Sequence, residues 1–219
     1  MTSKLRFPEF RNAPGWRTVP LGQLLSRSPE YGINAPAVPY SECLPTYLRI
    51  TDIDDNGRFI REGKVSVGVP VSEENYLSDG DIVLARTGAS VGKSYRHREA
   101  DGRLVFAGFL IRVRPNADTL VPTLLANYLT TRPYWDWVRA TSARSGQPGI
   151  NGSKYATLPV PIPKSDAEHD GVAEQRKIAA CLSSLDELIA AEGRKLEALK
   201  AHKQALMQQL FPSPEEAEA

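Results

Sequence analysis

The feature that most constrains this chain is a heptad repeat between residues 178 and 210. Aliphatic side chains recur there at alternating intervals of four and three residues, which places them along one narrow stripe of a helix. A stripe of this width is typical of a coiled coil, because a helix packed on a globular domain uses a wider apolar face. The stripe consists of Ile178, Leu182, Leu185, Ile189, Leu196, Leu199, Leu206 and Leu210, and the charged residues Glu192 and Lys203 interrupt it.

Signals at both ends of the repeat delimit a long helix. Asp170 and Glu174 stand where a helix N-terminus favours acidic side chains, and Phe211-Pro212-Ser213-Pro214 cannot continue the helix. The helix would be roughly 55 Å long. We predict a globular domain over residues 1–170, a spacer and dimerisation helix over residues 171–212, and a flexible tail over residues 213–219. An ordinary helix lying on its own domain is the alternative.

The first 170 residues show short strand and helix patterns without an internal repeat. Buried strands are expected at residues 81–85 and 104–114, and a hairpin is expected to turn at residues 54–57. Residues 120–140 are helical in pattern but broken at Arg132-Pro133, and alternating prolines make residues 158–163 extended. Residues 29–46 and 145–153 are typical of loops. The expected fold class is α/β, of mixed α+β character, followed by the long C-terminal coiled-coil helix.

The net charge of +1 conceals a basic segment. A local excess of positive charge on a nearly neutral chain predicts a polyanion-binding site, with a salt-bridged surface as the alternative. Between residues 86 and 114 the only acids are Glu99 and Asp101, whereas the bases are Arg86, Lys93, Arg96, Arg98, Arg103, Arg112 and Arg114.

The glycine-rich segment of residues 88–94 lies inside this basic stretch, directly after an expected buried strand. Its spacing is one residue too short for a nucleotide-binding phosphate loop, and no helical pattern follows, which argues against an NTPase. Backbone N–H groups, hydroxyls and cations in one turn instead suit contact with DNA phosphates or base edges. The candidate DNA-binding residues are Arg86, Thr87, Ser90, Lys93, Ser94, Tyr95, Arg96 and Arg98 around this turn, and Ser145, Gln147, Asn151 and Lys154 in a second loop.

No set of residues carries catalysis on its own. The histidines and the cysteines lack metal-ligand spacing. Asp54, Glu62 and Lys64 could be arranged as a magnesium nuclease site, but a solvated hairpin tip is the favoured interpretation. We therefore expect a non-enzymatic protein without a metal or cofactor. It carries neither a membrane-spanning run nor a signal peptide, so we expect it in the cytoplasm.

Several segments, in their order and spacing, resemble the specificity subunit of type I restriction–modification systems. The resemblance runs from Trp16 to about residue 212, nearly the whole chain. The segments are Trp16 with Leu21-Gly22, Gly80 to Lys93, Gly146-Gln147-Pro148-Gly149-Ile150-Asn151, Leu158-Pro159-Val160-Pro161-Ile162-Pro163, Glu174-Gln175-Arg176-Lys177-Ile178-Ala179, and Leu206-Met207-Gln208-Gln209-Leu210-Phe211.

The resemblance implies a DNA target-recognition domain followed by a spacer helix. In such subunits two recognition domains, joined by antiparallel helices, each recognise half of an interrupted DNA site; here we find one domain and one helix. We therefore expect a single-domain, or half, form that homodimerises through its heptad stripe. Heterodimerisation with another half and a coiled-coil adaptor without specific DNA recognition stay open. The implied partners are double-stranded DNA, a modification (methyltransferase) subunit that uses its own S-adenosylmethionine, and a restriction subunit where one is present.

Overall fold

The computed structural model describes residues 5–143 and 148–211, and it divides the chain into two compact units, Met1–Arg176 and Lys177–Ala219. The first unit holds all the strands and the three short helices. The strands are β1 (Trp16–Pro20), β2 (Glu30–Tyr31), β3 (Ala37–Pro39), β4 (Thr46–Leu48), β5 (Val65–Val67), β6 (Ile82–Ala85), β7 (Ser94–Arg96), β8 (Leu104–Phe106), β9 (Leu110–Val113) and β10 (Pro159–Pro163). The helices are α1 (Pro122–Tyr128), α2 (Arg132–Ser142), α3 (Gly152–Tyr155) and the long α4 (Gly171–Leu210).

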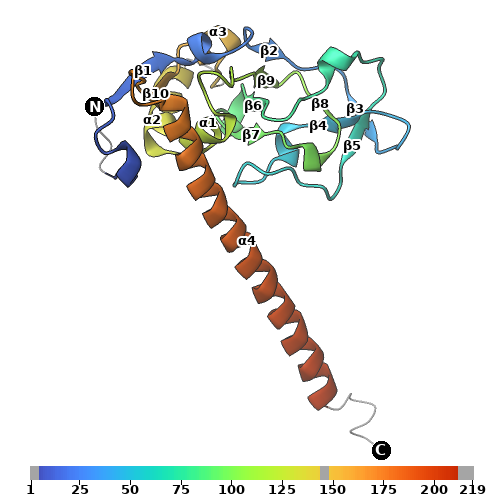
Figure 1. Cartoon of the computed structure of the whole chain (residues 1–219). Coiled ribbons are helices and arrows are strands. Elements are labelled where there is room, and N and C mark those ends of the chain that lie inside the picture. Colours follow the sequence, from blue (N-terminus) through green and yellow to red (C-terminus); the bar gives the residue numbers. More distant parts are fainter. Residues whose placement is uncertain (1–4, 144–147, 212–219) are drawn as a thin grey trace, which may run out of the picture. The chain divides into compact units, whose positions relative to one another are not determined.

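Three sheets organise the first unit. The central sheet has the antiparallel order β2-β9-β6-β7, and a second sheet has the order β3-β5-β4-β8 with a parallel β4–β8 pair. The third is the antiparallel pair of β1 and β10. Figure 1 shows β1, β10 and the short helices at one end of this unit, the second sheet at the other end, and β6 and β9 between them. The mixed α+β class expected from the sequence is therefore confirmed.

Strands β6 and β9 lie at the centre of the unit, and all four residues of each strand are buried. Val83 and Ala85 point into a core that also contains Leu104 and Phe106 of β8 and Leu110 of β9. Val105 and Ala107 face a separate core with Tyr47 and Val67. The apolar run from residue 104 onward is thus continuous because both of its faces are buried.

One expected strand was wrong, and one expected hairpin is shorter than predicted. Residues 104–114 form two strands in different sheets, because the chain turns at residues 107–109, where the Leu110 N–H donates to the Ala107 carbonyl at 2.8 Å. The turn at residues 54–57 exists, with the Asp54 carboxylate accepting from the Asn56 and Arg58 N–H groups at 2.8 Å. The hairpin around it is reduced to one bridge between Ile53 and Phe59, because β4 pairs with β5 and β8 instead.

The other expectations hold with small changes. The helical stretch is divided into α1 and α2 immediately before Arg132-Pro133, and the proline-rich segment is extended as β10. The expected loop at 29–46 contains the short strands β2 and β3. Of the expected loop at 145–153, residues 148–151 are described and lead into α3. These elements are too short to leave a periodic signal in the sequence.

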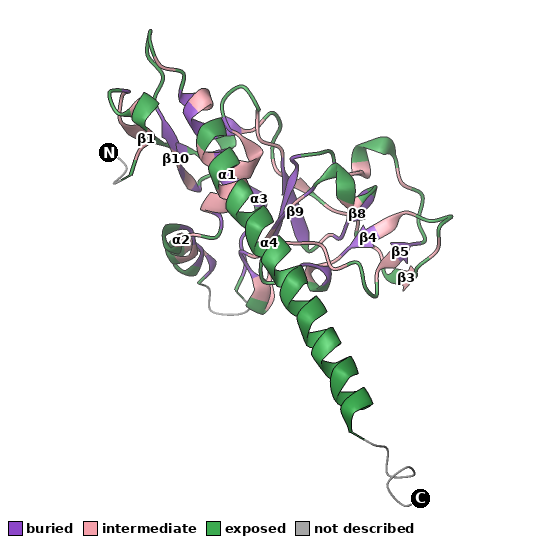
Figure 2. Ribbon diagram, turned by 60° about the horizontal axis from the view of Figure 1, so that its bottom comes forward, coloured by how far each residue is buried: buried purple, intermediate pink, exposed green. Residues whose placement is uncertain are grey.

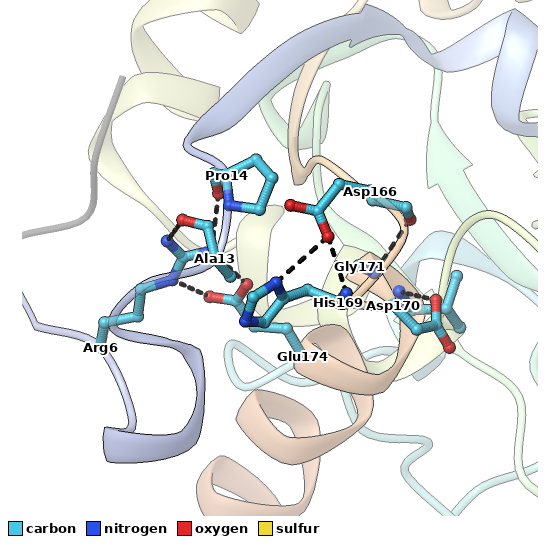
Figure 3. Close-up of polar contacts among 10 residues, drawn as sticks. Arg6, Ala13, Pro14, Asp166, His169, Asp170, Gly171 and Glu174 are labelled. Atoms are coloured by element: carbon cyan, nitrogen blue, oxygen red, sulfur yellow. Dashed lines mark hydrogen bonds and ion pairs between the residues drawn. The ribbon is translucent and has the colours of Figure 1, made fainter.

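The first turn of α4 is held by buried polar side chains (Figure 3). Glu174 is 1% exposed, and the Arg6 guanidinium donates to both of its carboxylate oxygens, at 2.8 and 2.6 Å. Arg6 also donates to the Ala13 and Pro14 carbonyls. Gln175 is equally buried, accepts from the Val121 N–H and donates to the Thr119 carbonyl. The acidic residue interpreted as a helix-dipole signal is therefore one half of a buried ion pair.

From residue 177 onward α4 stays one continuous helix to Leu210, about 60 Å in all from Gly171. Its aliphatic stripe is exposed from Leu185 to Leu210, with 41% to 74% of each stripe residue accessible, whereas Ile178 and Leu182 are half-buried. Figure 2 shows this length of the helix as exposed. Among the described residues, none of the helices has the length and apolar character needed to cross a membrane.

The buried ion pair predicts the effect of removing one charge. Glu174→Gln leaves the Arg6 guanidinium buried beside a neutral partner, so the free energy of unfolding of the first unit should fall by about 2 kcal/mol. Urea unfolding followed by tryptophan fluorescence measures it, because all three tryptophans lie in this unit. Glu187→Gln, on an exposed position of α4, is the matched control. Equal stabilities of the two variants would contradict the role given to Glu174.

Candidate nucleic-acid interface

The glycine-rich segment forms a closed turn at the end of β6. A short 3-10 helix spans Gly88–Ser90, and Gly88 and Gly92 have positive φ angles of 74° and 90°. The Gly92 N–H donates to the Ala85 carbonyl at 3.0 Å, and the Ala85 N–H donates to the Lys93 carbonyl at 2.8 Å. A side chain at Gly92 would come within 2.8 Å of Val138 on α2. Glycine is thus required by both conformation and space.

Backbone hydrogen bonds join this turn to the second candidate loop. The Gly88 N–H donates to the Pro148 carbonyl at 3.1 Å, and the Ile150 N–H donates to the Arg86 carbonyl at 2.9 Å. A bridge between Thr87 and Gly149 lies between these two bonds. Two loops that are about sixty residues apart in the sequence therefore form one surface. We call residues 86–94 and 148–154 together the paired loops.

Most of the candidate residues lie at the surface of the paired loops. Thr87, Ser90, Lys93 and Ser94 are half-buried, and Asn151 and Lys154 are exposed. The Lys93 ammonium lies 3.3 Å from the exposed Asp55 carboxylate. The Asn151 side chain caps α3 by accepting from the Lys154 N–H at 2.8 Å, so its amide group is still available for a ligand. Ser145 and Gln147 lie outside the described residues.

Three candidates follow along β7 and beyond it. Arg96 is half-buried, and desolvation together with Arg98 lowers the pKa of its guanidinium. Arg98 is exposed. Tyr95 directly precedes Arg96 on β7 but is only 2% exposed. Its hydroxyl donates to Asp101 at 2.9 Å and lies 3.2 Å from His97 Nδ1. Its expected contact with DNA is therefore corrected to a core position, because alternate residues of a strand point to opposite faces.

The basic segment does not form one patch. The Arg112 side chain is 3% exposed, and it donates to Glu30 at 2.9 Å and to two backbone carbonyls. Arg114 lies 3.1 Å from the same Glu30 carboxylate, and Arg103 pairs with Glu73 at 2.7 Å. Together with Lys93, which lies beside Asp55, four of the seven bases are thus paired with acids outside the segment. Within the described residues, the bases without such a partner are Arg86, Arg96 and Arg98, and Lys93 pairs with an exposed carboxylate at the surface.

Arg86 has a different environment from these paired arginines. Its guanidinium lies 4.9 Å from the centre of the Tyr31 ring and donates to the Gly108 carbonyl at 3.4 Å. The Tyr31 hydroxyl in turn accepts from the Gly152 N–H at 3.1 Å, so β2 is tied to the second loop. Among residues 5–143 and 148–211 no carboxylate pairs with Arg86. The part played by Tyr31 could not be found from the sequence, where it stands in an expected loop without a motif.

A shallow apolar hollow lies beside Arg86. It has a volume of about 400 Å³, and its walls include Ile33, Tyr47, Gly108 and Phe109. The Phe109 side chain is 60% exposed, and its carbonyl accepts from the Arg86 N–H at 3.1 Å. Phe109 was not singled out from the sequence either, because it lies within what looked like one continuous strand.

Two of the three residues weighed as a nuclease site make other contacts. Asp54 accepts the backbone bonds of its own turn, and the Lys64 ammonium lies 3.8 Å above the Tyr40 ring. In the part of the chain that the structure describes, no three histidine, cysteine or acidic residues are grouped so that they could hold a metal ion.

The family follows from comparison with known proteins. A model described as the type I restriction modification DNA specificity domain matches residues 41–201. The chain belongs to this family. The match contains β4 to β10 and both of the paired loops. It also contains the anchored first turn of α4 and most of that helix.

Relatives agree with this membership. The type I restriction enzyme MjaVIII specificity subunit of Methanocaldococcus jannaschii is 21% identical over 208 residues, covering 94% of this chain and 43% of the relative. The HsdS subunit from Thermoanaerobacter tengcongensis shares the fold with a TM-score of 0.61 and 19% identity, over 97% of this chain and 52% of that one. The type I S subunit from M. genitalium has a TM-score of 0.56 at 15% identity, over 90% and 46%. This chain thus spans about half the length of each.

The buried ring behind the paired loops predicts a pH dependence. Burial lowers the pKa of His97 below 6.5 against the opposing effects of Asp101, Asp81 and Asp79, so the folded chain favours the neutral ring. The unfolded chain binds more protons in this range, so stability should decrease as the pH falls from about 7.5 to about 5.5. Denaturant midpoints across this range measure the slope.

The slope should become shallower in His97→Gln and stay unchanged in His202→Gln, whose imidazole is exposed on α4. Burial raises the pKa of Asp81, which makes the folded chain more stable as the pH falls. This effect is opposite in sign to that of His97 and occurs in more acidic solutions. An unaltered slope in His97→Gln would show that another group causes the dependence.

Proposed function

We propose that this chain is a non-catalytic DNA-recognition component of a type I restriction–modification complex. Residues 1–170 would recognise one half of an interrupted site, and residues 171–212 would connect that half to the other. The observation that carries the proposal is the backbone pairing of the two candidate loops, which brings together the segments that carry Arg86, Lys93 and Lys154. Cations of this kind supply phosphate affinity, and the polar groups among them can contact base edges.

The second half of the site would come from a second copy of the chain. The described chain leaves a stripe of leucines exposed along α4, and such a stripe is stable only when another helix covers it. Two copies would supply two recognition domains. An antiparallel homodimer has two-fold symmetry and should recognise an interrupted palindrome. A heterodimer with a different half is the alternative.

The chemistry would belong to the partners. A modification subunit would methylate adenine with S-adenosylmethionine, and a restriction subunit, where one is present, would cut DNA. This chain would hold the modification subunit on its site. A cytoplasmic location follows from that role.

The function is tested by sequencing methylated adenines in a host that expresses this chain with its modification subunit. An interrupted palindrome is the expected motif. An asymmetric two-part motif would replace the homodimer by the heterodimer. Absence of methylation beside a modification subunit that is active with another specificity subunit would overturn the recognition role and favour the adaptor.

The environment of Arg86 gives this function a more specific form. One N–H of the guanidinium bonds to Gly108, and the guanidinium lies 4.9 Å from the centre of the Tyr31 ring. The guanidinium has five N–H donors, so an edge stays available for a bidentate contact. Such a contact matches guanine O6 and N7 in the major groove. We therefore expect a guanine in the recognised half-site.

Variants of two bases separate specificity from general affinity. Arg86→Lys keeps the charge but loses the planar fork, so discrimination against a replaced guanine should fall by about 10- to 100-fold. Lys93→Ala should weaken binding to all sequences alike and reduce the salt slope by about one unit. Binding of the assembled complex to cognate and guanine-substituted DNA, over a range of salt concentrations, measures both.

Two controls accompany these measurements. Tyr31→Phe removes the hydroxyl that accepts from Gly152 but keeps the ring beside Arg86, so it should preserve the guanine preference. Lys164→Ala removes an exposed cation beyond the end of β10 and should leave binding unchanged. A base preference that survives Arg86→Lys would remove Arg86 from the specificity contacts.

A further inference from the structure

The charged positions of the heptad stripe point to one arrangement of two copies. We propose that α4 pairs antiparallel with α4 of a second copy in the register that places Glu192 opposite Lys203. This inference rests on the proposed homodimer and adds its geometry. It uses only the sequence of the helix and the exposure of its side chains.

The register is tested first against the stripe itself. With Glu192 facing Lys203, Ile189 faces Leu206, Leu185 faces Leu210 and Leu196 faces Leu199. Every layer then joins two stripe residues. The two charges meet twice, once on each side of the two-fold axis. In each layer, a stripe residue that comes three residues after the preceding stripe residue faces one that comes four residues after its own preceding stripe residue. Antiparallel heptads require this combination.

Other arrangements place the charges badly. A parallel pair in register sets Glu192 against Glu192 and Lys203 against Lys203. An antiparallel pair shifted by one heptad in one direction sets Lys203 against Leu185 and Glu192 against Leu196. The opposite shift sets Lys203 against Leu199 and Glu192 against Leu210. Like charges repel in the parallel pair. In the shifted pairs, a charge in an apolar layer loses hydration without gaining a partner on the other helix, so each alternative is less stable.

Side-chain exposure supports the same register independently. The paired segment runs from Leu185 to Leu210, and these are the stripe residues that the described chain leaves exposed. Ile178 and Leu182 fall outside the segment and are already half-buried. The register therefore covers the exposed stripe and needs no residue beyond Leu210.

A geometrical consequence follows for the two copies. The two-fold axis crosses the pair between residues 197 and 198, so the two Lys177 residues lie about 60 Å apart along the helices. Insertions or deletions of whole heptads on either side of the axis would change this separation in defined steps. The spacing between half-sites is thereby linked to the register.

Disulfide trapping of the full-length chain tests the register. Cys43 and Cys181 are both free and exposed, so they are first replaced by serine. Ile189→Cys combined with Leu206→Cys should give a covalent dimer under mild oxidation, because these positions face each other across the pair. Leu182→Cys combined with Leu206→Cys is the matched control, since those positions meet only in the register shifted by one heptad.

The outcomes are distinct. Efficient cross-linking of the first pair and at least tenfold slower cross-linking of the control would support the register. Faster cross-linking of the control would overturn it. So would efficient cross-linking of Ile189→Cys alone, which is expected only of a parallel pair. Leu196→Glu, which charges a central layer, should abolish the covalent dimer while the tryptophan fluorescence of the first unit stays native.

Charge exchange gives a second, reversible test. Glu192→Lys should weaken dimerisation by at least about tenfold in sedimentation equilibrium, because two lysines then meet in each charged layer. Glu192→Lys combined with Lys203→Glu should restore the wild-type affinity. Failure of the double exchange to restore it would overturn the pairing.

These results separate the register from the proposed function. A palindromic methylation motif together with another cross-linking pattern would overturn the proposed register but keep the proposed function. A chain that stays monomeric, and methylates only beside a different specificity chain, would remove the homodimer and the register but keep the recognition role.

Discussion

The candidate interface depends on the backbone bonds that join residues 86–88 to residues 148–150. A turn at the end of a buried strand carries polar side chains in many proteins, and by itself it indicates no ligand. Here the Gly88 and Ile150 N–H groups join that turn to a loop that follows α1 and α2 in the sequence. Fixed backbone on both sides lets short side chains act together at one surface. The glycines of the turn matter for the same reason, because Gly92 lies where a side chain would strike α2.

Electrostatics inside the first unit are mostly internal. Arg112, Arg114 and Arg103 are held by Glu30 and Glu73, and Arg6 is held by Glu174. Such pairs orient strands and fix the first turn of α4, but they leave no charge for a polyanion. Arg86 is distinguished by an aromatic ring and a carbonyl in place of a carboxylate. An arginine oriented without being neutralised is the kind of group that a DNA-recognition surface needs.

The helix α4 combines two kinds of interaction along its length. Its first turn uses buried polar groups, Glu174 and Gln175, which are satisfied within the first unit. The rest carries an exposed aliphatic stripe with one acid and one base in it. The apolar layers contribute affinity but do not select one register, whereas the two charges distinguish one register from its neighbours. Stability and specificity are thus assigned to different residues of the same helix.

The sequence by itself determined the long helix, its aliphatic stripe, the buried strand β6, the break between α1 and α2 and the extended β10. Each of these follows from local periodicity or from the backbone limits of proline and glycine, which neighbours in the chain suffice to reveal. The family resemblance, too, lay in short segments and their spacing. Only the tertiary structure decided that residues 104–113 divide between two sheets, that Tyr95 is buried and that Tyr31 supports Arg86. It also decided which bases are neutralised, because Arg112 and its partner Glu30 are separated by 82 residues. Contacts over such separations depend on how the sheets assemble, and no local pattern in the chain records them.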